Sequence, residues 1–188
     1  MAKKVGGARK TETFTTRLEP REKYMLEILA RVSGRSIAKT LEAAIELLGQ
    51  EVKFPQRIGL SKRETSVRSL MDILWSPQEW RRIIALGSTA PELLTFDEEC
   101  KLTLLTQSSS LCTLIERTSR GGIISVEVFP RRVELAWPLI EERAQLMADG
   151  KPAPPVTLEE IEEHAGEKLP DPDDDSLQIK FNTFHAGD

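Results

Sequence analysis

The sequence predicts a mostly helical protein with minor β structure, in which a short strand and two helices precede a second, mainly helical unit. Three observations support this fold class. Residues 13–18 alternate polar and apolar side chains, apolar residues recur at helical spacing up to residue 48, and further helix-start signals follow residue 62. We therefore expect two structural units joined by a linker.

The strand predicted over residues 12–18 has no neighbouring strand in the sequence. A single strand leaves its backbone donors and acceptors unmatched, so it needs a partner. We expect it to pair antiparallel with the same strand of a second copy, which makes the protein a homodimer. Its period of two gives a polar face and a mainly apolar face: Thr13, Thr15 and Arg17 on the first, and Phe14, Thr16 and Leu18 on the second.

The first helix is predicted to begin at Pro20, whose fixed φ suits the first helical position, and to end at Gly34, which suits a left-handed cap. Ser36 is then expected to cap a second helix that ends at Gly49. Both helices carry an apolar face at helical spacing. These faces consist of Tyr24, Met25, Ile28, Leu29 and Val32 in the first helix, and of Ile37, Leu41, Ala44, Ile45 and Leu48 in the second.

One strand and two short helices bury too little area to be stable alone. Two copies could close a shared core from four helices and the paired strands. We expect that core to contain Phe14, Leu18, Ile28, Val32, Leu41 and Ile45. Two alternatives remain: a helical hairpin whose edge strand packs on the C-terminal unit, and a second strand-helix copy within residues 123–150.

The segments TFTTRLEPRE and SGRSIAKTLEAAIELL, within residues 12–49, resemble the ribbon-helix-helix DNA-binding family of the Arc, MetJ and CopG type. The resemblance implies an intermolecular two-stranded antiparallel sheet with four helices in the dimer, and a ribbon that enters the major groove of double-stranded DNA. It also implies that Thr13, Thr15 and Arg17 face base edges, which their hydrogen-bonding groups can read. Thr16 departs from the family pattern, in which an apolar residue is more usual.

The start of the second helix resembles the phosphate clamp of that family, because free backbone N–H groups at a helix N-terminus attract anions. The expected phosphate contacts there are Arg35, Ser36, Ile37, Ala38 and Lys39. Residues 1–10 are expected to form a flexible basic arm that tracks the DNA backbone without reading sequence. Its basic residues are Lys3, Lys4, Arg9 and Lys10.

The two ends of the chain differ in charge. Residues 1–70 hold 15 Lys and Arg against 8 Asp and Glu, whereas residues 71–188 hold 11 against 22. Charges further apart than a Debye length of about 8 Å are largely screened, so the acidic part does not prevent the basic part from binding a polyanion.

The rest of the chain is expected to comprise three parts. Residues 51–61 are interpreted as a linker, residues 62–150 as a mainly helical domain, and residues 151–188 as an acidic, flexible tail. Before them, the resemblance implies a ribbon-helix-helix domain for DNA binding and dimerisation over residues 11–50.

Several elements are expected within the later parts of the chain. A helix capped by Ser76 should begin at Pro77 and end at Gly87. One long or two short helices should cover 97–119, a strand should follow over 123–129, and Pro138 should interrupt or start the next helix. Leu177, Ile179 and Phe181 alternate and could pair with the 123–129 strand.

No nucleophile with its base, phosphate-binding glycine loop or metal-ligand cluster is recognisable. We therefore expect neither an enzyme nor a cofactor or metal. Cys100 and Cys112 are interpreted as buried or free thiols, and His164 and His185 as surface residues. No membrane span or secretory signal is predicted, so a cytoplasmic location is expected.

The function that follows is a dimeric, sequence-specific DNA-binding protein, most simply a transcriptional repressor. Residues 62–150 would serve assembly into higher oligomers or bind a protein partner. The resemblance leaves other roles open: a plasmid or mobile-element accessory protein in a relaxosome or in partition, or an antitoxin. A scaffold that does not bind DNA is a further alternative.

Overall fold

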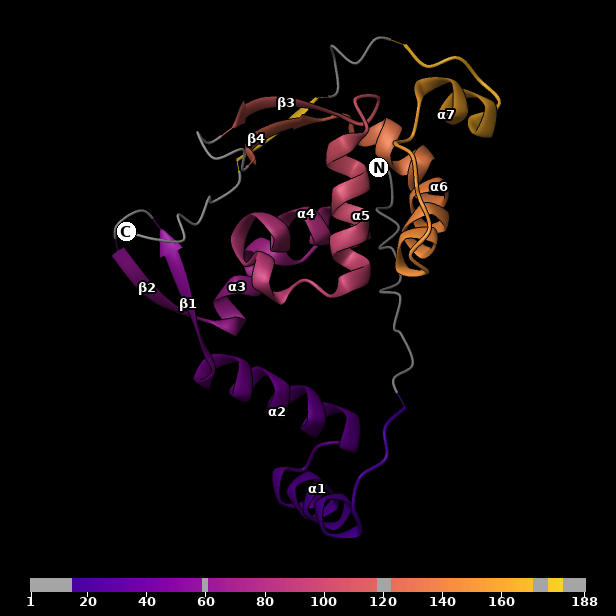
Figure 1. The fold of residues 1–188 in the computed structure, drawn as a ribbon. Coiled ribbons are helices and arrows are strands. Elements are labelled where there is room, and N and C mark those ends of the chain that lie inside the picture. Colours follow the sequence, from indigo (N-terminus) through magenta and orange to yellow (C-terminus); the bar gives the residue numbers. More distant parts are fainter. Residues whose placement is uncertain (1–14, 59–60, 118–122, 171–175, 181–188) are drawn as a thin grey trace, which may run out of the picture. The chain divides into compact units, whose positions relative to one another are not determined.

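The structure is a computed structural model of the 188-residue chain, and it describes residues 15–58, 61–117, 123–170 and 176–180. The chain divides into two compact units, Met1–Gly49 and Gln50–Asp188. The described residues are mostly helical, as the sequence predicts, and antiparallel strands provide the rest of the regular structure (Figure 1).

The first unit contains α1 (Pro20–Ser33) and most of α2 (Ile37–Glu51). Pro20 occupies the first helical position and Gly34 takes the left-handed conformation with φ 65°, so both predictions are confirmed. The Arg35 amide donates to the Ala30 carbonyl at 3.0 Å, which closes the turn that Gly34 allows. The two helices are therefore joined by a short, well-specified connection.

The second helix begins as predicted but ends later. Ser36 Oγ accepts a hydrogen bond from the Lys39 amide at 3.2 Å, which is the geometry of an N-cap. The predicted end at Gly49 is wrong, since α2 continues to Glu51. A glycine costs a helix only about 1 kcal/mol relative to alanine, so it does not have to stop one.

Residues 15–19 have no regular secondary structure in the single chain, and Glu19 is extended at φ −61° and ψ 150°. Residues 12–14 of the predicted strand lie outside the described residues. A strand that pairs with a second copy cannot form its ladder in one chain, so the ribbon stays a prediction.

The second unit contains two antiparallel sheets and most of the helices (Figure 1). One sheet is a hairpin, and the other has the strand order β3-β4-β5. The hairpin strands are β1 (Lys53–Ile58) and β2 (Ser61–Ser66), and the three-stranded sheet consists of β3 (Cys112–Arg117), β4 (Ile123–Val128) and β5 (Leu177–Lys180). The helical elements are α3 (Val67–Leu74), α4 (Glu79–Thr89), the 3-10 turn η1 (Pro91–Leu93), α5 (Phe96–Gln107), α6 (Pro130–Ala148) and α7 (Leu158–Ala165).

The core of this unit is formed by α4, α5, α6, α7 and the three-stranded sheet. Helix α5 packs on α6, α6 packs on α7, and β3 follows α5 directly. The fully buried side chains of this core include Leu104, Leu111, Val126, Ile140 and Ile161. Cys100 and Cys112 are free thiols buried in it, as expected, and burial raises the pKa of Cys112 to about 11.

Several predicted elements of the second unit are wrong. Residues 53–58 of the predicted linker form β1. The helical structure expected over 97–119 ends at Gln107, and β3 follows. Beyond that end, the Ser108 hydroxyl donates to the Leu104 carbonyl in the last turn of α5 and accepts from the Val156 amide. The predicted flexible tail contains α7, whose Ile161 is fully buried.

Helix α4 begins two residues after the predicted start and passes through its predicted end. Ser76 Oγ accepts from the Gln78 amide at 3.2 Å, so Ser76 and Pro77 form a turn ahead of the helix. At Gly87 a Cβ atom would lie 2.5 Å from Leu102 Cδ2. The glycine therefore accommodates the close approach of α5 and does not end the helix.

The predicted pairing of the last strand is confirmed over the described residues. In the register of β4 with β5, Val126 stands opposite Ile179 and Val128 opposite Leu177. Because β4 also pairs with β3, it has partners on both sides within the chain. A second ribbon-helix-helix copy over 123–150 would need a free edge there, so that alternative is wrong.

Pro138 neither starts nor interrupts α6, which runs without a break from Pro130. The proline side chain is exposed, so its ring does not disturb the packed face of the helix. It lacks an amide hydrogen, and the Glu134 carbonyl consequently loses its usual intrahelical donor.

Candidate nucleic-acid interface

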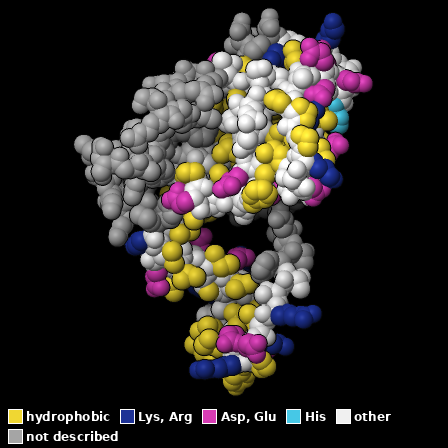
Figure 2. Space-filling view, in the orientation of Figure 1, with side chains coloured by type: hydrophobic (Ala, Val, Ile, Leu, Met, Phe, Trp, Pro, Cys, Tyr) yellow, Lys and Arg dark blue, Asp and Glu magenta, His cyan; other side chains and the backbone are white. Residues whose placement is uncertain are grey.

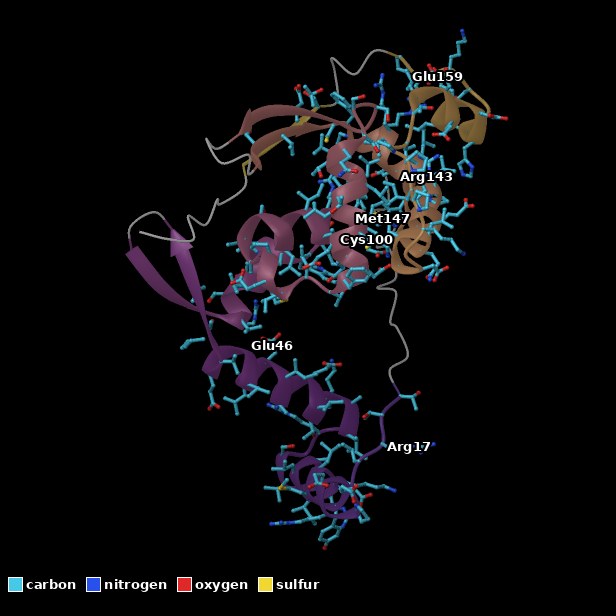
Figure 3. The ribbon with its side chains drawn as sticks, viewed as in Figure 1. Arg17, Glu46, Cys100, Arg143, Met147 and Glu159 are labelled. Carbon is cyan, nitrogen blue, oxygen red and sulfur yellow. The ribbon has the colours of Figure 1, made fainter. Side chains whose placement is uncertain are left out.

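The residues predicted to read bases precede the first helix. Thr15 and Arg17 are exposed, and Figure 3 shows Arg17 projecting from its segment away from the two helices. Thr13 lies outside the described residues, as do Phe14 and the arm residues Lys3, Lys4, Arg9 and Lys10. The described part of the predicted reading face is therefore accessible, and its polar groups are available to a ligand.

The N-terminus of α2 has the geometry expected of an anion site. Ser36 caps the helix, and the amides of Ile37 and Ala38 belong to the first turn, where no intrahelical acceptor exists. The Thr40 hydroxyl donates to the Ser36 carbonyl at 3.0 Å and fixes the turn further. Such a helix end attracts negative charge.

The structure brings two of the predicted phosphate contacts together. Arg35 and Lys39 line one open groove with Glu42, Ala43 and Glu46. Lys39 Nζ forms an exposed ion pair with Glu42 Oε2 at 2.5 Å. Exposed pairs of this kind contribute about 0–1 kcal/mol, so Lys39 can exchange Glu42 for a phosphate at little cost.

The residues predicted to form the dimer core are poorly covered in the single chain. Leu18 is 45% exposed, Val32 83%, Leu41 39% and Ile45 63%, whereas Ile28 is partly buried. Among the described residues of this unit, only Ala30 and Thr40 are buried. Figure 2 shows the hydrophobic side chains at the surface of the helix pair, among Lys and Arg side chains. The helix pair thus lacks a core of its own.

Sequence reasoning missed the hairpin of β1 and β2, which carries four basic residues against one acidic residue. In its register Arg57 stands opposite Lys62, and Gln56 stands opposite Arg63. Alternation does not reveal it, because every residue of 61–66 is polar. The hairpin follows α2 directly, and the Val67 amide donates to the Val52 carbonyl at its base.

In the described ranges no three or more His, Cys, Asp or Glu residues are grouped so that they could hold a metal ion. None of the helices in those ranges combines the length and apolar composition that a bilayer crossing requires.

Comparison of the chain with protein-family models, with curated proteins and with solved structures gives no match to any of them.

Proposed function

We propose that the protein is a homodimeric, sequence-specific DNA-binding protein of the ribbon-helix-helix type, acting in the cytoplasm as a transcriptional repressor. The observation that carries the proposal is the combination of two capped helices, an apolar surface that the single chain leaves uncovered, and a polar segment ahead of them. The pairing of two copies would cover the apolar surface and give the segment its missing strand partner.

The apolar surface of the helix pair is large for so small a unit. Ten large hydrophobic side chains of this unit are at least 39% exposed. Complete burial of an aliphatic side chain contributes on the order of 1.5–3 kcal/mol, so covering the exposed part of several such groups together would favour association. These residues are Leu18, Tyr24, Met25, Leu29, Val32, Ile37, Leu41, Ile45, Leu47 and Leu48.

In the proposed dimer, Thr13, Thr15 and Arg17 of both copies read base edges in the major groove. Arginine can bind guanine O6 and N7 with two hydrogen bonds, and each good base contact contributes about 1–3 kcal/mol of discrimination. The start of α2 holds the flanking phosphates through its backbone amides. The basic hairpin of β1 and β2 adds a sequence-independent contact to the DNA backbone.

The experiment is selection of bound fragments from sheared genomic DNA by the purified full-length protein, with competitor DNA at physiological salt. Arg17→Ala is compared with Arg21→Ala, which removes the same charge from an exposed position in the first turn of α1. We expect Arg17→Ala to lose enrichment and Arg21→Ala to keep it. Equal enrichment in the two variants would contradict base reading by Arg17.

The position of the enriched fragments distinguishes the biological roles. Enrichment upstream of the protein's own gene supports a repressor. Enrichment at a transfer origin or a partition locus instead supports an accessory role in a relaxosome or in segregation. Absence of enrichment with the wild-type protein would overturn DNA recognition and favour a protein-interaction role.

A further inference from the structure

A pocket on the second unit lies between the start of α4 and the outer face of α6. Its volume is about 290 Å³ and it is open to solvent. The lining combines acidic and aromatic side chains: Gln78, Glu79, Trp80, Glu134, Trp137 and Glu141. Trp80 belongs to the hydrophobic core and Trp137 packs against it, but the proposed DNA-binding role uses none of the polar groups of this pocket.

One of the three carboxylates, that of Glu79, already has a cationic partner. Lys101 Nζ pairs with Glu79 Oε1 at 2.9 Å and with Asp97 Oδ2 at 2.8 Å. Burial lowers the pKa of Lys101, but its hydrogen bonds to Asp97 and Glu79 outweigh burial and raise it above the ordinary value. Lys101 is therefore a fixed cation, and it also lies 6.0 Å from the ring centroid of Trp137.

The other two carboxylates have no cationic partner within the part of the chain that the structure describes. Glu134 accepts a hydrogen bond from the neutral amide of Gln78. Glu141 lies two helical turns further along α6, with Trp137 between them on the same side. The pocket consequently holds two uncompensated negative charges beside an aromatic ring.

Two further groups at this site, one on a side chain and one on the backbone, also lack their usual partners. Trp80 is 3% exposed, and its Nε1–H has no hydrogen-bond acceptor among the described residues. A buried donor without an acceptor is costly, and a ligand oxygen would satisfy it. In addition, Pro138 frees the carbonyl of Glu134, so a further acceptor is available on the same helical turn.

We propose that this pocket binds an arginine side chain from a basic segment of a partner protein. The guanidinium group stacks on Trp137 and donates to Glu134 and Glu141, and a backbone carbonyl of the partner accepts from Trp80 Nε1. Arginine fits better than lysine because its planar group has five donors and stacks on aromatic rings. The negative charge excludes nucleic acid, so the site is separate from the DNA-binding surface.

The probe is a fluorescent ten-residue Gly-Ser peptide with three arginines, titrated into the full-length protein and followed by anisotropy. Matched peptides carry lysine or citrulline in place of arginine. The pocket variant is Glu134→Gln/Glu141→Gln, and the control Glu142→Gln/Glu163→Gln removes equal charge from exposed positions on α6 and α7. All four side chains are exposed, and glutamine keeps their size, so both variants should fold.

We expect the arginine peptide to bind the wild type and the control equally, and to bind the pocket variant about fivefold to 25-fold more weakly, as for two partly exposed ion pairs. Trp80→Phe keeps most of the ring volume and should also weaken binding. If both double variants bound the arginine peptide equally weakly, the loss of binding would follow from net charge alone, and the proposed arginine site would be wrong. A lysine peptide that binds as tightly, or free arginine that competes as well as the peptide, would overturn the assignment to a protein arginine.

Discussion

Ser108 and Val156 are 48 positions apart in the sequence, yet Ser108 Oγ accepts a hydrogen bond from the Val156 amide at 2.9 Å. Ser110 reinforces this link, because its hydroxyl donates to the Val156 carbonyl at 2.6 Å. Both serines are buried. The two bonds attach the segment that leads into α7 to the turn between α5 and β3.

Ser108→Ala should therefore destabilise the second unit. The substitution leaves the buried Val156 amide without an acceptor, at a cost of about 1–3 kcal/mol. Urea denaturation followed by tryptophan fluorescence would measure the change in the free energy of unfolding. Ser109→Ala is the control, since Ser109 is exposed, and an equal decrease in both variants would argue against the Ser108 bond.

Val32→Asp should separate the proposed dimer. Val32 is 83% exposed in the single chain, and burying an apolar side chain contributes about 1.5–3 kcal/mol for each copy. We expect the dissociation constant of the dimer to rise about 100-fold or more, measured by sedimentation equilibrium. Lys23→Gln is the control, because it changes the charge by the same one unit and, at 100° per residue, position 23 lies on the opposite face of α1. A dimer that survives Val32→Asp would place the interface elsewhere.

The basic hairpin should contribute to the salt dependence of DNA binding. Arg57→Gln/Lys62→Gln removes the charges that stand opposite each other in the register of β1 and β2. The slope of log K against log salt should become shallower by about 0.9 for every phosphate that the hairpin no longer neutralises, while preference between DNA sequences stays unchanged. The control Arg131→Gln/Lys151→Gln removes the same charge from exposed positions outside the hairpin. A salt dependence with an unaltered slope would mean that the hairpin does not contact the DNA backbone.

Glu160 should make the second unit sensitive to acid. The Thr157 amide donates to Glu160 Oε2 at 2.9 Å, and this hydrogen bond is the main cause that lowers the pKa of the Glu160 carboxyl. Burial acts in the opposite direction and raises the pKa, whereas the ion pair with Arg143 lowers it further. Figure 3 shows Arg143 on α6 beside α7. Because the folded-state pKa is below the unfolded value, the stabilisation is present above about pH 4.5 and is lost as the pH falls through the folded value.

Denaturation of Glu160→Gln and wild type at neutral and acid pH tests this linkage. The variant should be less stable near pH 7, and the difference should shrink toward pH 3. Glu159→Gln serves as control, because Glu159 is exposed and does not cap the helix. A difference that is constant over this range would contradict the role given to the Glu160 carboxylate.

The parts of the fold that the sequence predicts well are those fixed by local chemistry. Pro20 and Gly34 define the start and end of α1, and Ser36 defines the start of α2, because each acts on the backbone within one turn. Strands β1 and β3 were missed because short strands depend on partners elsewhere in the chain, and neither alternation nor composition revealed those partners. The acidic run concealed α7, although Thr157 and Glu160 form a capping box that is readable in the sequence.

The functional sites also differ in how far they could be predicted from the sequence. The anion-binding geometry at Ser36 follows from helix capping, so sequence reasoning could locate it. The pocket of Trp80 and Trp137 could not be found in this way, because α4 and α6 meet only through tertiary packing. The proposed ribbon would involve a second copy, so a single chain would not contain the contacts that define it.

The position of β5 decides where the second unit can be cut. Residues 177–180 cover one edge of β4, while β3 covers the other. A fragment that stops after α7 would keep the helices but leave a row of β4 amides and carbonyls open, a template for adding strands from other molecules. Protein engineers who isolate this unit for partner screening should retain the strand, because a shorter version would be expected to form aggregates that imitate binding.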